Sequence, residues 1–256
     1  MKRIVLFFLA ASTIYLASCE TTKEITLRPD GTGILSTTSD MSSILGLAKM
    51  AGEGNELEKL KDEKAVDTTV SMEKLVDEIP DLTAEEKELV KKGTLGFNMD
   101  LKNDKLVTQM TFPFTKTNEI STIDKMYSRV ITQVMKKQLD NDSSKTGMPA
   151  GLGNGKLPDG SIDDYYAFNI SKGLVERKLL ADKYAKVGDD EGMKAMKEMS
   201  SMGVGNSKLI LYLPSPAKKA EGKNVTLSED KKKVTIMSSM EDFFDDGKSL
   251  EFRIEF

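Results

Sequence analysis

The chain has 256 residues, of which 39% are hydrophobic and 30% charged, a composition typical of a folded protein and not of a disordered chain or a multi-span membrane protein. It contains no histidine, no tryptophan and a single cysteine, Cys19. These absences exclude histidine-dependent catalysis, histidine metal ligands and a disulfide bond within the chain.

The N-terminus has the pattern of a bacterial secretion signal. Lys2 and Arg3 precede an uncharged apolar run, residues 4–17, which is shorter than the roughly 20 residues that a membrane-spanning helix needs. The run ends in Leu16-Ala17-Ser18-Cys19, which resembles the bacterial lipobox at all four positions. The resemblance implies that residues 1–18 are a cleaved signal peptide and that Cys19 carries a diacylglyceryl thioether and an acylated amino group.

Two or three lipid chains on Cys19 make an effectively stable membrane anchor, whereas one chain binds only marginally. The alternative is an ordinary secreted protein with a chance cysteine. Glu20 stands where a strong inner-membrane retention signal of enteric bacteria has aspartate, so the outer membrane is favoured. The sequence therefore predicts a lipid-anchored protein of the cell envelope whose partner is the membrane itself.

Charge argues against nucleic acid as a partner. Loss of Lys2 and Arg3 with the signal leaves 35 of the 37 basic residues against 41 acidic ones. The basic residues of the whole chain include only five arginines, so the planar guanidinium groups that read guanine or clamp phosphate are scarce. The run Lys231-Lys232-Lys233 is interpreted as a solvated hairpin end that discourages pairing at a sheet edge.

Residues 19–24 are predicted to be a short lipid-anchored tether, and residues 25–256 to form one α+β domain. Period-two alternation and turn residues predict strands in chain order at residues 25–27, 34–38, 66–70, 95–101, 106–114, 165–170, 174–179, 209–213, 225–227, 234–236 and 250–256. Helical spacing and capping residues predict helices at residues 41–50, from 71 to a stop at Pro80, from 84 to Gly93, 118–139 and 181–202, and a short acidic helix containing Phe243 and Phe244.

The predicted strands occur in hairpins separated by helices, and single βαβ crossovers are not indicated. This order predicts a largely antiparallel sheet with amphipathic helices packed on it. Residues 140–164, rich in Gly, Asn, Asp and Pro, are expected to form a long flexible loop.

The predicted helix 181–202 carries methionines at every third position: Met193, Met196, Met199 and Met202. They form a slowly drifting stripe on one helix face. Core packing is the first interpretation. The stripe is also a candidate apolar-ligand surface, because methionine adapts to irregular apolar ligands, and thioethers can bind Cu(I).

Acidic residues supply the remaining candidate chemistry. Asp159, Asp163 and Asp164 could hold a cation from a loop, but turn and helix-cap roles are favoured. No established metal or cofactor motif occurs, so we expect neither a metal nor a cofactor. Two carboxylates at the right separation would suffice for a hydrolase, although the sequence does not single out a pair.

The layout of the chain resembles a set of uncharacterised Bacteroidota lipoproteins. The resemblance rests on the lipobox followed by residues 25–33, and on residues 233–236, Phe243-Phe244 and residues 250–252. A fainter similarity is to mycobacterial LppM-type lipoproteins, whose α+β domain is implied to contact lipids. Neither resemblance carries over a catalytic residue.

From these features we expect a lipid-anchored, non-enzymatic binding or structural module of the envelope, for an apolar ligand or an envelope partner. The alternative is a carboxylate-dependent envelope hydrolase.

Overall fold

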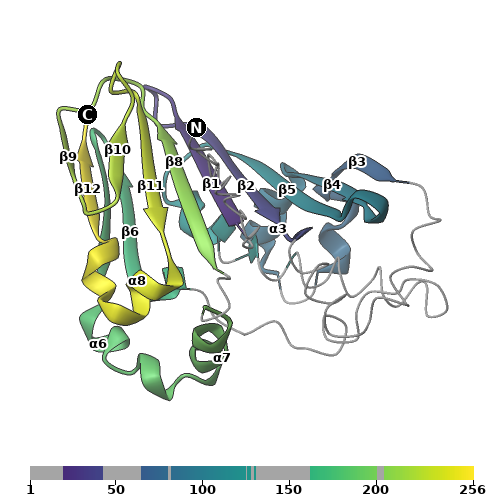
Figure 1. The fold of residues 1–256 in the computed structure, drawn as a ribbon. Coiled ribbons are helices and arrows are strands. Elements are labelled where there is room, and N and C mark those ends of the chain that lie inside the picture. Colours follow the sequence, from purple (N-terminus) through teal and green to yellow (C-terminus); the bar gives the residue numbers. More distant parts are fainter. Residues whose placement is uncertain are drawn as a thin grey trace, which may run out of the picture.

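The computed structural model describes residues 20–42, 65–79, 82–124, 126–127, 130, 162–200 and 205–256. Two sheets of unequal size pack together with short helices, as Figure 1 shows. The predicted α+β class with largely antiparallel pairing is confirmed.

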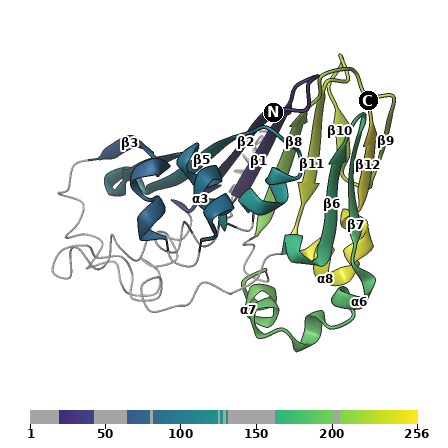
Figure 2. The same ribbon diagram turned by 180° about the vertical axis from the view of Figure 1, so that it is seen from behind.

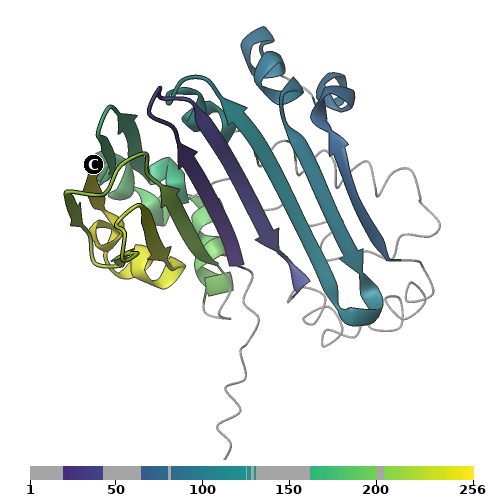
Figure 3. The same ribbon diagram turned by 90° about the horizontal axis from the view of Figure 1, so that it is seen from above.

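The larger sheet has eight strands in the order β10-β11-β8-β1-β2-β5-β4-β3, and Figure 3 shows from above how β1, β2, β5, β4 and β3 lie side by side. In chain order its strands are β1 (Glu20–Leu27), β2 (Gly33–Asp40), β3 (Val66–Ser71), β4 (Thr94–Asp100), β5 (Lys105–Phe114), β8 (Asn206–Tyr212), β10 (Val225–Leu227) and β11 (Lys233–Ser238). The predicted hairpins β1–β2, β4–β5 and β10–β11 are confirmed. The exception to antiparallel pairing is β1 with β8, which are parallel, with Glu20 opposite Asn206 and Thr26 opposite Tyr212.

The smaller sheet has four antiparallel strands in the order β6-β7-β12-β9. They are β6 (Tyr166–Ser171), β7 (Leu174–Leu179), β12 (Phe252–Glu255) and β9 (Lys219–Glu221). This sheet covers one half of a face of the larger sheet, and helices cover more of the same face, as Figure 2 shows. The division into two sheets, and β9 itself, were not predicted.

The helices are short. They are the 3-10 helices η2 (Met72–Lys74), η3 (Val76–Glu78), η4 (Leu101–Asn103), η5 (Ile162–Tyr165), η6 (Val187–Asp189) and η7 (Gly247–Leu250), and the α-helices α3 (Ala84–Lys91), α6 (Ala181–Tyr184), α7 (Glu191–Ser200) and α8 (Met240–Asp245). A further helical segment, called here the 119–130 helix, is described at residues 119–124, 126–127 and 130. No helix in these described ranges is long and apolar enough to cross a membrane.

Local chemistry fixes where α3 begins. The hydroxyl of Thr83 accepts a hydrogen bond from the backbone N–H of Glu86 at 3.2 Å, and the Glu86 carboxylate accepts one from the Thr83 N–H at 2.8 Å. Each bond satisfies a backbone donor that the first helical turn leaves without a partner. The predicted capping box is confirmed.

The predicted tether is wrong for residues 20–24, because β1 begins at Glu20. Backbone pairing with β2 on one side and with β8 on the other keeps these polar residues in a strand. Pairing with two neighbours therefore outweighs the polar character of the segment.

The predicted single helix 181–202 is also wrong, because the segment is divided into α6, η6 and α7. Asp190 accepts a hydrogen bond from the Met193 N–H and so starts a new helix at Glu191. The end of the predicted loop 140–164 is helical, since η5 begins at Ile162. The helix expected after Ser71 is the pair η2 and η3.

Several further predictions lie outside the described residues. They are the signal peptide with Cys19, almost all of the helix 41–50, the second part of the helix 118–139 and residues 140–161 of the loop.

One continuous apolar core joins the larger sheet to the layer that covers it. Ile25 and Leu35 of the larger sheet, Val175 and Ile254 of the smaller sheet and Ile120 of the 119–130 helix all belong to this core. The opposite face of the larger sheet carries polar side chains on alternate positions, among which Ser36 and Thr111 join their hydroxyls at 3.1 Å. This is the pattern of an antiparallel sheet with one buried and one solvated face.

A second core cluster lies at the end of the sheets where β1 begins, beside α7 and α8 (Figure 1). Its centre is Phe243, which is fully buried. The Phe243 ring meets the rings of Tyr165, Tyr184 and Phe244 edge-on, with centroids 5.5, 5.3 and 5.1 Å away. Such contacts add to the gain from apolar burial.

We predict that Phe243→Ala lowers the free energy of unfolding by about 3–5 kcal/mol, because it leaves a cavity among these rings. Denaturant unfolding monitored by circular dichroism measures the change. Met237→Ala is the control, because Met237 is 43% exposed and its loss should change stability by less than about 0.5 kcal/mol. Equal effects of the two substitutions would show that the second cluster contributes little.

Candidate functional site

A lysine occupies a core-facing position of β1. Side chains of a strand alternate between its faces, so Lys23 shares a face with the buried Ile25 and Leu27. The Lys23 side chain is 20% exposed, and its ammonium nitrogen lies 3.1 Å from an Asp124 carboxylate oxygen and 3.0 Å from one of Asp163. A partly buried cation thus bridges two acids from the layer that covers the sheet.

The second oxygen of Asp163 continues the network to β7. It lies 3.1 Å from a terminal nitrogen of Arg177, whose residue is only 6% exposed. The Arg177 guanidinium carbon is 3.9 Å from the centre of the Tyr166 ring, a cation–π distance. Lys23, Asp124, Asp163 and Arg177 form what we call the charge cluster, with two positive and two negative groups.

Four separate elements supply these groups: β1, the 119–130 helix, η5 and β7. The Tyr166 hydroxyl donates to the carbonyl oxygen of Gly247 at 2.7 Å, which fixes the ring beneath Arg177. The Nε atom of Arg177 is buried without a hydrogen-bond acceptor in the part of the chain that the structure describes. Arg177 is therefore held by the charge of Asp163 and by stacking on Tyr166.

The cluster shifts the pKa values of its members in different directions. Burial disfavours the charged form of Lys23, but the charges of Asp124 and Asp163 outweigh it and raise the pKa of the ammonium above its usual range. Burial would raise the pKa of Asp163, yet Lys23 and Arg177 hold it well below its usual range. For Asp124, burial and then the neighbouring Asp163 outweigh the contact with Lys23, and its pKa is raised.

These directions limit what the cluster can do chemically. Lys23 stays protonated and therefore cannot act as a nucleophile or a general base. Asp163 stays ionised, whereas Asp124 is the easier group to protonate. In catalytic pairs of carboxyl groups, one group is likewise ionised and the other protonated. The ammonium of Lys23 lies in contact with both carboxylates, so a substrate between them would have to displace it.

The predicted site residues are only partly within the described part of the chain. Met193 is buried at 1% exposure in the second core cluster, and Met196 packs against the same cluster. The backbone of Met199 continues α7, whereas Met202, Asp159 and the lipidation residue Cys19 lie outside the described residues. The two described methionine side chains therefore contact the core, in line with the packing interpretation.

In the structure, Asp163 lies in the first turn of η5 and pairs with Lys23 and Arg177. Lys23, Asp124 and Arg177 were missed by the sequence analysis. A signal was present for two of them: Lys23 precedes Ile25 and Leu27 in alternation, and Arg177 follows the buried Val175 by two positions. A charge on an apolar strand face needs a buried partner, but alternation does not name that partner.

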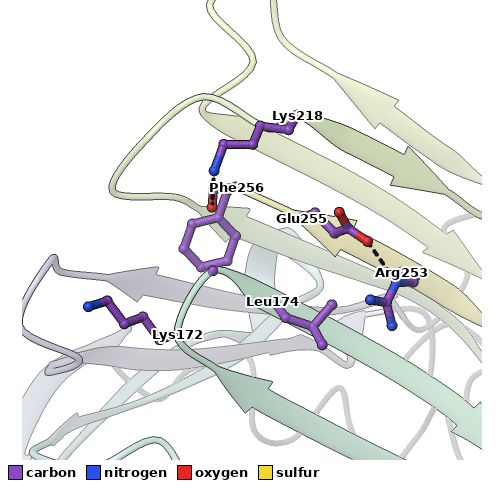
Figure 4. Close-up of a pocket in the computed structure, with 7 residues that line it drawn as sticks. Lys172, Leu174, Lys218, Arg253, Glu255 and Phe256 are labelled. Carbon is purple, nitrogen blue, oxygen red and sulfur yellow. Dashed lines mark hydrogen bonds and ion pairs between the residues drawn. The ribbon is translucent and has the colours of Figure 1, made fainter.

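A shallow hollow of about 510 Å³ lies at the end of the smaller sheet that contains the β6–β7 turn and the last residues of β12, away from the charge cluster. Figure 4 shows the side chains that line it: Lys172, Leu174, Lys218, Arg253, Glu255 and Phe256. Among the described residues, no group of three acids, cysteines or histidines is placed to hold a metal ion.

No protein-family model matches the chain, and no curated protein and no solved structure is significantly similar to it. The resemblance to Bacteroidota and LppM-type lipoproteins therefore stays a prediction.

We predict that Asp163→Asn lowers the free energy of unfolding at pH 7 by about 1–2 kcal/mol. This is less than the cost of breaking a fully buried pair, because 47% of the Asp163 side chain is exposed. Since the native pKa of Asp163 is lowered, its contribution is present above the unfolded pKa of about 3.9 and is lost as the pH falls further. The difference from wild type should therefore shrink below about pH 4.

Urea unfolding at pH 7, 5 and 3 measures this difference. Asp189→Asn is the matched control, because Asp189 is exposed in η6 and should show no such pH-dependent loss. A constant difference between wild type and Asp163→Asn at all three pH values would contradict the electrostatic explanation.

Proposed function

We propose that the mature chain is a lipid-anchored lipoprotein of the bacterial cell envelope that acts as a non-enzymatic binding or structural module. The observation that carries this proposal is the position of the lipobox. Cys19 directly precedes β1, which begins at Glu20 and pairs with neighbours on both sides. A lipid on Cys19 would thus be joined to an interior strand of the larger sheet without an intervening flexible linker.

Such an attachment would fix which end of the domain is near the membrane. Glu20 lies opposite Asn206, the first residue of β8, at the end of the sheets that carries α6, α7 and α8 (Figure 1). Along β1 the chain then runs about 25 Å to the other end. The helical end would face the bilayer, and the hollow of Figure 4 would face away from it.

An envelope partner is favoured over an apolar ligand as the bound molecule. Met193 and Met196 are already in contact with the second core cluster. The hollow at the far end is lined by charged as well as apolar side chains and is open to solvent. Both features suit recognition of an exposed partner better than enclosure of a lipid.

We predict that Cys19→Ser moves the protein from the membrane fraction to the soluble fraction, because the lipid attachment atom is lost. Immunoblotting of the two fractions measures the shift. Ser18→Ala is the matched control, since it keeps a small residue before Cys19 and should leave the protein in membranes. Membrane retention of Cys19→Ser would contradict the proposal.

A carboxylate-dependent hydrolase is the second candidate, and one observation favours it. Asp124 and Asp163 contact the same ammonium, and their pKa values are shifted in opposite directions. Separated pKa values of two neighbouring acids are a feature of acid–base catalysis, although structural ion pairs also produce them.

Hydrolysis assays with glycoside and ester substrates test the second candidate. If it is right, wild-type protein should hydrolyse a substrate, and Asp124→Asn should lose at least a hundredfold in rate, with Asp189→Asn unchanged. Our first proposal predicts no hydrolysis by any of the three proteins. Activity that Asp124→Asn retains would exclude this pair as the catalytic acids.

A further inference from the structure

Backbone hydrogen bonds bring several turns together at the end of the molecule that lies away from Glu20. The Ala217 N–H donates to the carbonyl oxygen of Lys231 at 2.8 Å, and the Lys218 N–H donates to that of Glu255 at 2.7 Å. Next to them, the N–H of Phe256 donates to the carbonyl oxygen of Gly173 at 3.0 Å. The β10–β11 turn, the segment before β9, the end of β12 and the β6–β7 turn are therefore neighbours.

This end of the molecule is basic. The turns at residues 28–32, 115–117, 171–173, 213–219 and 228–233 carry eight basic and three acidic residues. We call this surface the basic end. The sequence analysis interpreted the run 231–233 as a hairpin end that discourages pairing at a sheet edge. In the structure this run is one part of a surface formed by five separate turns.

Three of these cations are not neutralised by a neighbour. Lys116, Lys172 and Lys231 are exposed and make no side-chain ion pair or hydrogen bond within the described residues, whereas Lys232 lies near the Asp230 carboxylate. By contrast, Arg253 is paired with Glu176 at 3.1 Å and Glu255 at 3.0 Å. Seven of the eight basic residues in these turns are lysines, and the eighth is Arg28, which donates to the Thr32 hydroxyl at 3.3 Å.

The hollow adds an apolar surface beside these charges. Figure 4 shows Leu174 and the ring of Phe256 next to each other, with Lys172 and Lys218 on either side. The Lys218 ammonium donates to the Phe256 carbonyl oxygen at 3.2 Å, which holds it at the rim. The hollow, about 510 Å³ in volume, is open to solvent and therefore offers surface contact and not enclosure.

The opposite end has the opposite charge. Residues 181–200 and 239–250, which include α6, α7 and α8, carry nine acidic and five basic residues. The basic end is therefore a local excess of positive charge in a chain that is acidic overall. This separation of positive charge at one end from negative charge at the other attracts and orients an anionic partner over several ångströms.

We infer that the basic end, with the hollow beside it, binds an acidic polypeptide segment of an envelope partner. Most of these charges are lysines, which act as point charges and lack the forked geometry that favours phosphate. Arg28 donates to the Thr32 hydroxyl, and Arg253 is already paired. Leu174 and Phe256 provide apolar contact for side chains between the acidic residues. The inference deepens the proposed function, since an anchor at Cys19 would direct this end away from the bilayer and toward other envelope proteins.

The test is fluorescence anisotropy with labelled poly-L-glutamate. The protein is purified from cells in non-ionic detergent, which keeps lipidated and unlipidated chains in solution alike. Wild type should bind the probe, with an affinity that falls as salt is raised. Lys172→Glu combined with Lys232→Glu should weaken binding about tenfold or more, because each change replaces an attraction by a repulsion.

Lys186→Glu combined with Lys194→Glu is the matched control, with the same change in net charge at the helical end. It should alter the affinity less than about twofold. Equal weakening by both double variants would overturn the inference, as would stronger binding of polyphosphate or of mixed micelles containing phosphatidylglycerol. The anisotropy measurement does not require a lipid on Cys19. Absence of probe binding would therefore contradict the inference about the basic end without bearing on lipidation, which the Cys19→Ser experiment tests.

Discussion

The fold depends on how β1 is held. This strand pairs along its whole length with β2 and, from Glu20 to Thr26, in parallel with β8. It therefore connects segments that are almost 200 residues apart in sequence. Parallel pairing of such distant segments has a large cost in chain entropy, which burial along the strand must offset. Ile25 and Leu27 supply apolar burial, and Lys23 supplies the contact that joins β1 to the covering layer.

We expect the charge cluster to contribute more to specificity than to net stability. Transfer of two charge pairs from water into the protein costs several kcal/mol of free energy. The attraction between the charges offsets much of this cost only when every partner is in place. Lys23 accordingly favours the arrangement in which η5, the 119–130 helix and β7 all meet β1. A one-residue shift in the register of β1 would turn Lys23 to the solvated face, leaving Asp124 without its ion-pair partner and Asp163 without Lys23 but still paired with Arg177.

Local patterns predicted local structure well. Strict alternation located β4 and β5, and the capping box located the start of α3, because turns and caps are decided by residues a few positions apart. The site could not be predicted in the same way. Lys23 and Asp163 are 140 positions apart, and the hollow and the basic end come from turns that meet only in the folded chain. The break between α6 and α7 was not predicted, because the methionine spacing alone indicated one helix, and the capping role of Asp190 is seen only in the structure.

We propose that a lipid on Cys19 holds the helical end of the domain against the membrane and directs the basic end away from it. Lipidation would consume the single cysteine, so Lys186→Cys and Lys232→Cys each introduce one labelling site, at opposite ends of the molecule. The direct measurement is quenching of a fluorophore at each site by headgroup-labelled lipid in vesicles that carry the protein. The account predicts strong quenching at position 186 and little at position 232. Equal quenching at the two positions, or the reverse order, would contradict it.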